Sequence, residues 1–196
     1  MRALFGTDGI RGRAGEYPLD PATVSRVGGA LASVLREAGR PSPLTVVLGC
    51  DTRVSSGIVA ALSGGLIAAG AGVRFAGVVP TPAVAHLVRA LGADAGISIS
   101  ASHNPWPDNG IKVFSSEGRK LPDALEAEIE RRIATSAPAE PIPPAEDSSL
   151  PELYENHLVE RLPKRLDGLK VVVDCANGAA FQVAPEAFRR AGAEVV

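Results

Sequence analysis

The chain has 196 residues, of which 45% are hydrophobic and 21% are charged. At about 100–200 residues per domain, this length provides one complete domain and part of a second, and the apolar fraction excludes a disordered chain. The 20 basic and 22 acidic side chains leave a formal net charge of −2, so the clustered basic excess of a nucleic-acid-binding protein is missing.

Neither a membrane nor an exported location is indicated. No apolar run approaches the roughly 18–20 residues of a membrane span, and a polar, glycine-rich stretch begins at Gly6, where a secretory signal would need its apolar region. Cys50 and Cys175 are too few for a disulfide scaffold and lack metal-ligand spacing. We therefore expect a cytoplasmic protein with reduced thiols and with no nucleic-acid or membrane partner.

Helical and strand-like segments alternate in the first two thirds of the chain. Asp20-Pro21 is typical of a helix N-cap followed by proline in the first turn, and the helical spacing of apolar residues ends at Gly39. Buried apolar runs indicate strands. This alternation predicts a three-layer α/β/α domain with a mostly parallel mixed sheet. Strands are expected at 44–49, 71–79, 95–100 and 111–114, and further helices at 55–69, from 82, and at 121–133.

The composition changes after residue 134. Five prolines and few apolar residues between 137 and 151 indicate a linker or an exposed crossing segment. From residue 169 the sequence echoes residues 44–51, since each copy has a buried strand that leads to a cysteine, here expected at 169–174, and a helix closing with Ala-Gly-Ala. We therefore predict a first domain at 1–134, a connecting region at 135–168, and the truncated start of a second, similar domain at 169–196. We expect the chain to be the N-terminal portion of a longer protein.

Two loops carry candidate chemistry. In the first, residues 5–12, glycines let backbone N–H groups approach an anion, and Arg11 offers a planar fork for phosphate; a simple glycine-rich turn with a surface ion pair is the alternative. In the second, Ser102 and His103 follow a buried strand, where ligands collect in open α/β sheets. A nucleophile beside an acid or base is one interpretation, and local turn chemistry ahead of Pro105 is the other.

Further polar residues leave their roles open. The segment Asp108-Asn109-Gly110-Ile111-Lys112 predicts a tight turn that delivers Lys112 to the next strand, or a hairpin in which this lysine is merely solvated. Arg53, two residues after Asp51, contacts a ligand or forms a local ion pair. His86 and His157 lie in helical stretches, where packing or solvent exposure is the expected role.

The motifs Phe-Gly-Thr-Asp-Gly-Ile-Arg-Gly at 5–12, Ser-Ala-Ser-His-Asn-Pro at 100–105 and Asp-Asn-Gly-Ile-Lys at 108–112 together resemble the α-D-phosphohexomutase superfamily. The resemblance runs the length of the chain. It implies that Ser102 is phosphorylated and passes its phosphoryl group to a hexosamine 6-phosphate, giving a 1,6-bisphosphate. Arg11 and Lys112 would stabilise the transferring phosphate. The proton on the sugar hydroxyl would be managed by His103 or by Lys112, and the sequence leaves both open.

The resemblance also implies a Mg²⁺ cofactor, with a phosphate oxygen on Ser102 as one ligand. The family supplies the remaining oxygens from an Asp-Gly-Asp-type loop in its second domain, and this sequence has no such loop. We therefore expect these 196 residues to be inactive by themselves.

The reaction implied is the isomerisation of glucosamine 6-phosphate to glucosamine 1-phosphate. The resemblance implies that the sugar is read by a loop in the family's third domain, beyond the part of the family that this sequence resembles. A mutase of the same superfamily that acts on glucose or mannose phosphates is therefore the nearest alternative, and a non-catalytic phosphate-binding module is an alternative of another class.

Overall fold

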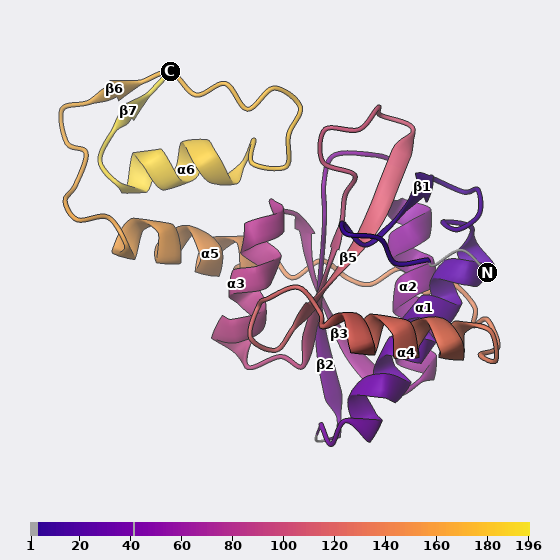
Figure 1. Ribbon diagram of the computed structural model, residues 1–196. Coiled ribbons are helices and arrows are strands. Elements are labelled where there is room, and N and C mark those ends of the chain that lie inside the picture. Colours follow the sequence, from indigo (N-terminus) through magenta and orange to yellow (C-terminus); the bar gives the residue numbers. More distant parts are fainter. Residues whose placement is uncertain (1–3, 41) are drawn as a thin grey trace.

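The computed structural model describes residues 4–40 and 42–196, and its main body is a five-stranded sheet covered by helices on both faces (Figure 1). The strand order is β1-β5-β4-β2-β3. This confirms the three-layer α/β/α fold. The strands are β1 (Ile10–Arg13), β2 (Leu44–Cys50), β3 (Ala71–Val78), β4 (Ala95–Ile99) and β5 (Asp108–Ser115), and the covering helices are α1 (Pro21–Glu37), α2 (Ser56–Ala68), α3 (Thr81–Leu91), α4 (Asp123–Ile133) and α5 (Ser149–Glu160).

The two faces of the sheet are packed by different helices. Alternate residues of β2 point to opposite sides, so that Val46 and Leu48 join the core under α1, α2 and α4, while Val47 joins the core under α3 and α5. Helix α1 begins where the sequence predicts, because the Asp20 side chain accepts a hydrogen bond from the Thr23 amide at 3.0 Å. No helix in the described part of the chain has the length and hydrophobicity needed to cross a bilayer.

The sheet is mixed and mostly parallel, as expected, because β1, β2, β3 and β4 run in one direction and β5 runs against them. Strand β2 pairs in parallel with β3 and β4, whereas β5 runs antiparallel to both β4 and β1. The reason is the short connection at 100–107, since a parallel crossover needs about a dozen residues or more. The connection therefore returns the chain directly beside β4.

The expected turn at Asn109-Gly110, and its hairpin alternative, are both wrong. These two residues lie inside β5, opposite Gly12 and Arg11 of β1, a strand that the sequence analysis did not predict. Asn109 is buried and donates to the Ser55 hydroxyl at 2.9 Å. A side chain at Gly110 would lie 2.7 Å from the Ser100 carbonyl oxygen, so glycine serves here for a close strand approach rather than for a turn.

The proline-rich segment between α4 and α5 crosses the outside of the domain and is held against it. The amide of Ala139 donates to the Ser25 hydroxyl at 2.8 Å, and the amide of Ile142 donates to the Ala60 carbonyl at 2.9 Å. Farther on, Asp147 pairs with Arg74 of β3. The sequence allowed either a linker or an exposed crossing segment here, and the structure shows the exposed crossing segment.

The last residues form a small β-α-β unit beside α5 (Figure 1). Its strands β6 (Lys170–Val171) and β7 (Glu194–Val195) pair in parallel, and α6 (Val183–Arg190) lies between them in the chain. Arg190 joins α6 to α5 through an ion pair with Glu155 at 3.1 Å. Strand β6 is shorter than the strand expected at 169–174, because its one partner, β7, is itself two residues long, and Val172 is left 78% exposed.

A stacked pair of histidines joins α3 to α5. The His86 and His157 rings lie 3.8 Å apart, centre to centre, at an interplanar angle of 19°. Burial, followed by the neighbouring His157, lowers the pKa of His86 below its ordinary 6.5. The nearby charges of Arg89 and Arg161 act in the same direction, and that of Glu160 opposes them.

This lowered pKa makes the stability of the protein depend on pH. Because folding disfavours the protonated ring, the unfolded chain binds more protons between the lowered pKa and 6.5, and stability therefore falls as the pH drops through that window. The measurement is the free energy of unfolding in urea at about pH 7.5 and about pH 5.5. Between these two pH values, we expect this free energy to fall less in His86→Asn than in the parent protein. An equal loss in both proteins would contradict this assignment.

The two cysteines differ in environment and should differ in reactivity. Cys50 is buried at the end of β2, and burial, with smaller effects from Asp51 and Glu146, raises the pKa of its thiol to about 11. Since the thiolate is the reactive form, we expect iodoacetamide to alkylate the partly exposed Cys175 and to spare Cys50 in the folded protein. Peptide mass mapping checks this, and preferential labelling of Cys50 would contradict it. Both thiols should react in urea.

Candidate active site

Ser102 lies in the loop that joins β4 to β5, residues 100–107, which we call the serine loop. Its backbone has φ +56°, a left-handed conformation that is costly for a side chain with a Cβ and that often marks functional sites. Its amide donates to the Ser100 hydroxyl at 3.1 Å, and its own hydroxyl lies exposed, 3.4 Å from Nδ1 of His103. The structure thus presents a hydroxyl and an imidazole together at the carboxyl end of a central strand.

Arg11 reaches this loop from β1, where it lies opposite Gly110. Its Nη1 donates to the carbonyl of Ala101 at 2.6 Å and to Oδ1 of Asn104 at 3.2 Å, and its Nη2 lies 3.7 Å from a carboxylate oxygen of Asp8. The ion pair that the sequence offered as an alternative is therefore present, and the same guanidinium also borders the serine loop.

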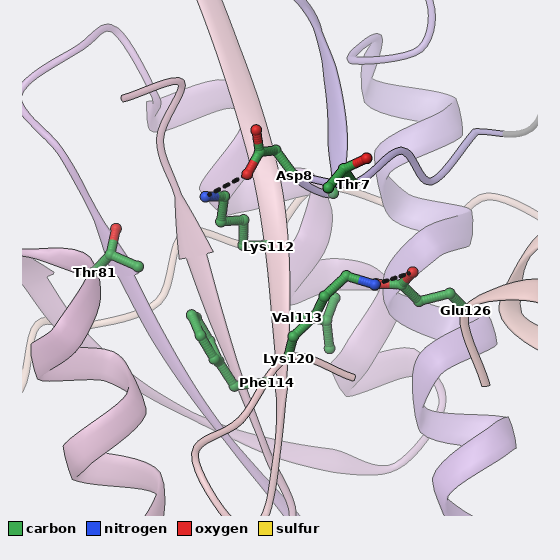
Figure 2. A pocket seen from close by; sticks show the side chains of 9 residues that line it. Thr7, Asp8, Thr81, Lys112, Val113, Phe114, Lys120 and Glu126 are labelled. Carbon is green, nitrogen blue, oxygen red and sulfur yellow. Dashed lines mark hydrogen bonds and ion pairs between the residues drawn. The ribbon is translucent and has the colours of Figure 1, made fainter. Parts of the chain in front are cut away.

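Lys112 lies on the neighbouring strand β5, directly across from Ser98 of β4. Its ammonium pairs with Asp8 at 3.3 Å and lines a hollow of about 260 Å³ (Figure 2). Thr81, at the start of α3, borders the same hollow and places its hydroxyl 3.1 Å from that of Ser98. Figure 2 shows Lys112 between Thr81 and Asp8, with the Lys120–Glu126 pair farther along the wall.

Arg53 is the residue whose part in the site the sequence did not reveal. It forms the expected local ion pair, with its Nε 3.0 Å from Asp51, and both side chains are 13% exposed. Its two terminal nitrogens also donate to three carbonyls of the serine loop, at 2.6 Å to Ser102, 2.9 Å to Asn104 and 2.9 Å to Pro105. The signal in the sequence was the spacing Asp-x-Arg directly after a buried strand.

The candidate residues border three adjoining hollows, and the serine loop lines two of them. Ser102 and Arg53 line a groove of about 780 Å³ that includes residues 177–180, whereas His103 and Arg11 line one of about 840 Å³. Asn104 borders both of these, and Asp8 borders both the larger hollow and the one with Lys112. Of the four residues expected from the sequence, Ser102, His103 and Arg11 therefore meet at the serine loop, although Ser102 lines a different hollow from His103 and Arg11. Lys112 lines the third hollow.

The described residues do not by themselves make a Mg²⁺ site. Within 4–40 and 42–196, no group of three or more histidine, cysteine, aspartate or glutamate side chains is arranged to hold a metal ion. Asp8 and Asp51 border the hollows, but each is paired with a cation. Since Mg²⁺ needs several oxygen ligands, this set does not fit the ion.

The fold and the cations around Ser102 define an α/β domain suited to a phosphate group, because guanidinium and ammonium groups bind phosphate oxygens strongly. The family described as "Phosphoglucomutase/phosphomannomutase, alpha/beta/alpha domain I" matches residues 2–140, and the chain belongs to this family.

Curated relatives and solved structures agree with this assignment. The chain is 52% identical to the phosphoglucosamine mutase of Salinispora arenicola and 50% identical to that of Thermobifida fusca, in each case over its whole length but over 45% of the relative. A phosphoglucomutase/phosphomannomutase family protein from Burkholderia thailandensis superposes with a TM-score of 0.80 at 30% identity, covering all of this chain and 43% of that one. The chain thus spans about half the length of the relatives it matches.

Proposed function

We propose that the protein isomerises glucosamine 6-phosphate to glucosamine 1-phosphate, with Ser102 as the residue that carries the phosphoryl group. The observation that carries the proposal is the exposed Ser102 hydroxyl, held in a strained loop among cationic side chains. The choice of sugar is supported by the relatives at about 50% identity, which are named phosphoglucosamine mutases.

The proposed reaction transfers the phosphoryl group twice. The phosphorus–Oγ bond of phosphorylated Ser102 breaks as a new bond forms to a hydroxyl of the sugar phosphate, which gives a 1,6-bisphosphate; the reverse transfer of its other phosphate returns the product and the phosphoserine. Such transfers depend mainly on positioning and charge stabilisation. Arg11 supplies positive charge at the serine loop, and Lys112 supplies it on the neighbouring strand β5, where it is paired with Asp8.

For the proton of the attacking sugar hydroxyl, His103 is favoured over Lys112. The His103 ring lies 3.4 Å from the Ser102 hydroxyl, whereas the Lys112 ammonium is paired with Asp8. A base must reach the proton that it removes within hydrogen-bonding distance or through one water. We therefore assign the proton transfer to His103 and charge stabilisation to Lys112.

The proposal includes a Mg²⁺ requirement that residues 4–40 and 42–196 do not satisfy by themselves. A phosphate oxygen on Ser102 would be one ligand, and the carboxylates that complete the site would come from outside these 196 residues. We also propose the domain boundaries given above, with the phosphoserine domain at 1–134, the connection at 135–168 and the beginning of a second domain at 169–196. A cytoplasmic location and the absence of nucleic-acid partners stay predictions from the sequence.

The deciding experiment is an assay of the whole reading frame that contains residues 1–196, with the 6-phosphates of glucosamine, glucose and mannose as competing substrates. We expect turnover to be highest with glucosamine 6-phosphate. A preference for glucose or mannose phosphate would overturn the substrate while keeping the chemistry. No turnover with any of the three, and no phosphate on the purified protein, would favour a non-catalytic phosphate-binding module.

A further inference from the structure

Arg53 donates nearly all of its side-chain hydrogen bonds to acceptors within the protein itself. A guanidinium has five N–H donors. The Nε donor goes to Asp51, both Nη2 donors go to the carbonyls of Ser102 and Asn104, and one Nη1 donor goes to the carbonyl of Pro105. Four of the five donors are therefore committed, so that the side chain is built to hold the loop rather than to bind a phosphate.

Asp51 fixes the position of the Arg53 side chain through two hydrogen bonds. One carboxylate oxygen of Asp51 accepts from Arg53 Nε at 3.0 Å, and the other accepts from the Arg53 amide, also at 3.0 Å. The amide of Asp51 donates to the carbonyl of Ile99, the last residue of β4, at 3.0 Å. The guanidinium thus projects from the ends of two paired central strands, β2 and β4.

The three bound carbonyls belong to the strained residue itself and to two residues that follow it, Asn104 and Pro105. Ser102 has φ +56°, and its own carbonyl accepts the shortest of the three bonds at 2.6 Å. A left-handed serine persists where its surroundings over-determine it. Arg11, on β1, holds the preceding carbonyl, that of Ala101, at 2.6 Å. With both guanidiniums in place, the Ser102 Cα–Cβ bond has a fixed direction toward the groove.

We propose that Arg53, oriented by Asp51, is a positioning residue that holds phosphorylated Ser102 in line for phosphoryl transfer. It also keeps the carbonyl oxygens of the loop pointed at its own positive charge, so that these oxygens do not repel the phosphate dianion. The inference rests on the proposed function for its catalytic consequence, but the hold on the loop is a property of the chain whatever its substrate. A displacement of about 1 Å in a reacting group can cost about 100-fold in rate.

The test uses two variants and a matched control in the whole reading frame. Arg53→Met removes the fork and keeps much of the side-chain volume. Arg53→Lys keeps the charge, but a single ammonium cannot serve Asp51 and three separated carbonyls. Arg74→Met is the control, because it also breaks an arginine–aspartate pair, on β3, away from the serine loop.

We expect both Arg53 variants to lower kcat by about 100-fold with little change in KM for the sugar phosphate. Backbone hydrogen exchange should become faster in a peptide covering 100–108, where the Asn104 amide bonds to the Ala101 carbonyl and the Asp108 amide to the Pro105 carbonyl. Arg74→Met should change neither quantity. If Arg53→Met does not fold, Arg53→Lys decides.

Wild-type kcat and wild-type loop exchange in Arg53→Lys would overturn the proposal, because positive charge alone would then suffice. If the parent protein shows no mutase turnover, the proposed function has failed, and exchange still decides the hold on the loop. Faster exchange at 100–108 in Arg53→Lys would support that hold, and unchanged exchange would overturn it.

Discussion

Replacing Ser102 with alanine is expected to remove both the phosphate carried by the protein and its mutase turnover. Alanine has no oxygen with which to form the phosphate ester, so neither half of the proposed double transfer can take place. We expect a loss of at least about 10⁴-fold, to the background of the assay. Intact-mass analysis of the purified protein and a coupled assay with glucosamine 6-phosphate measure the two effects.

The loss should come from chemistry and not from unfolding. Alanine keeps a Cβ at φ +56°, so the backbone strain is similar in both proteins. The matched control is Ser116→Ala. Ser116 directly follows β5, and its hydroxyl accepts a hydrogen bond from Arg40. This variant should keep both the phosphate and the turnover. Full activity in the Ser102→Ala protein would remove Ser102 from the mechanism, and phosphate on that protein would place the modification elsewhere.

The parts of the fold that were predictable carry their signal in local sequence. Helix α1 has a side-chain cap at Asp20 and regular apolar spacing, and β2 is a continuous buried run. Strand β1 has neither feature, because it is four residues long and exists through its pairing with β5, about a hundred positions away in the chain. The Asn109-Gly110 pair misled for the same reason, since tertiary pairing overrides a local preference for turns.

The candidate site divides in a similar way. Ser102 and His103 were found because they follow a buried strand, where open α/β sheets gather their ligands. The sequence indicated an ion pair between Arg53 and Asp51 as one possibility, but it did not indicate the hydrogen bonds from Arg53 to the serine loop. The acceptors in the loop are backbone carbonyls, which every residue type carries, so the sequence cannot indicate them. The Ser102 carbonyl is also 49 positions from Arg53 in the chain. The pairing of β2 with β4 is what brings the two loops together.

Replacing Gly9 with alanine should be the most destabilising of the small substitutions near the site. Gly9 has φ +83°, and a Cβ built there would overlap the backbone carbonyl oxygen of Ile111 on β5. Ile111 lies on β5, which is paired with a strand on each side, so its backbone carbonyl cannot move aside cheaply. We expect a loss of about 4 kcal/mol in the free energy of unfolding, at the upper end for single substitutions. Turnover should fall as well, because the neighbouring Asp8 would lose its place beside Lys112.

Gly15 provides the matched control, because it has nearly the same backbone angle, φ +84°, with no atom within 4 Å of an added Cβ. Gly15→Ala pays the strain of the left-handed conformation alone, about 1 kcal/mol. The difference between the two variants in urea unfolding therefore measures the clash with β5. Equal losses would show that the loop at 6–9 can move away from β5 at no cost, and the close approach of Gly9 to Ile111 would then not be what fixes Asp8 and Arg11 beside the serine loop.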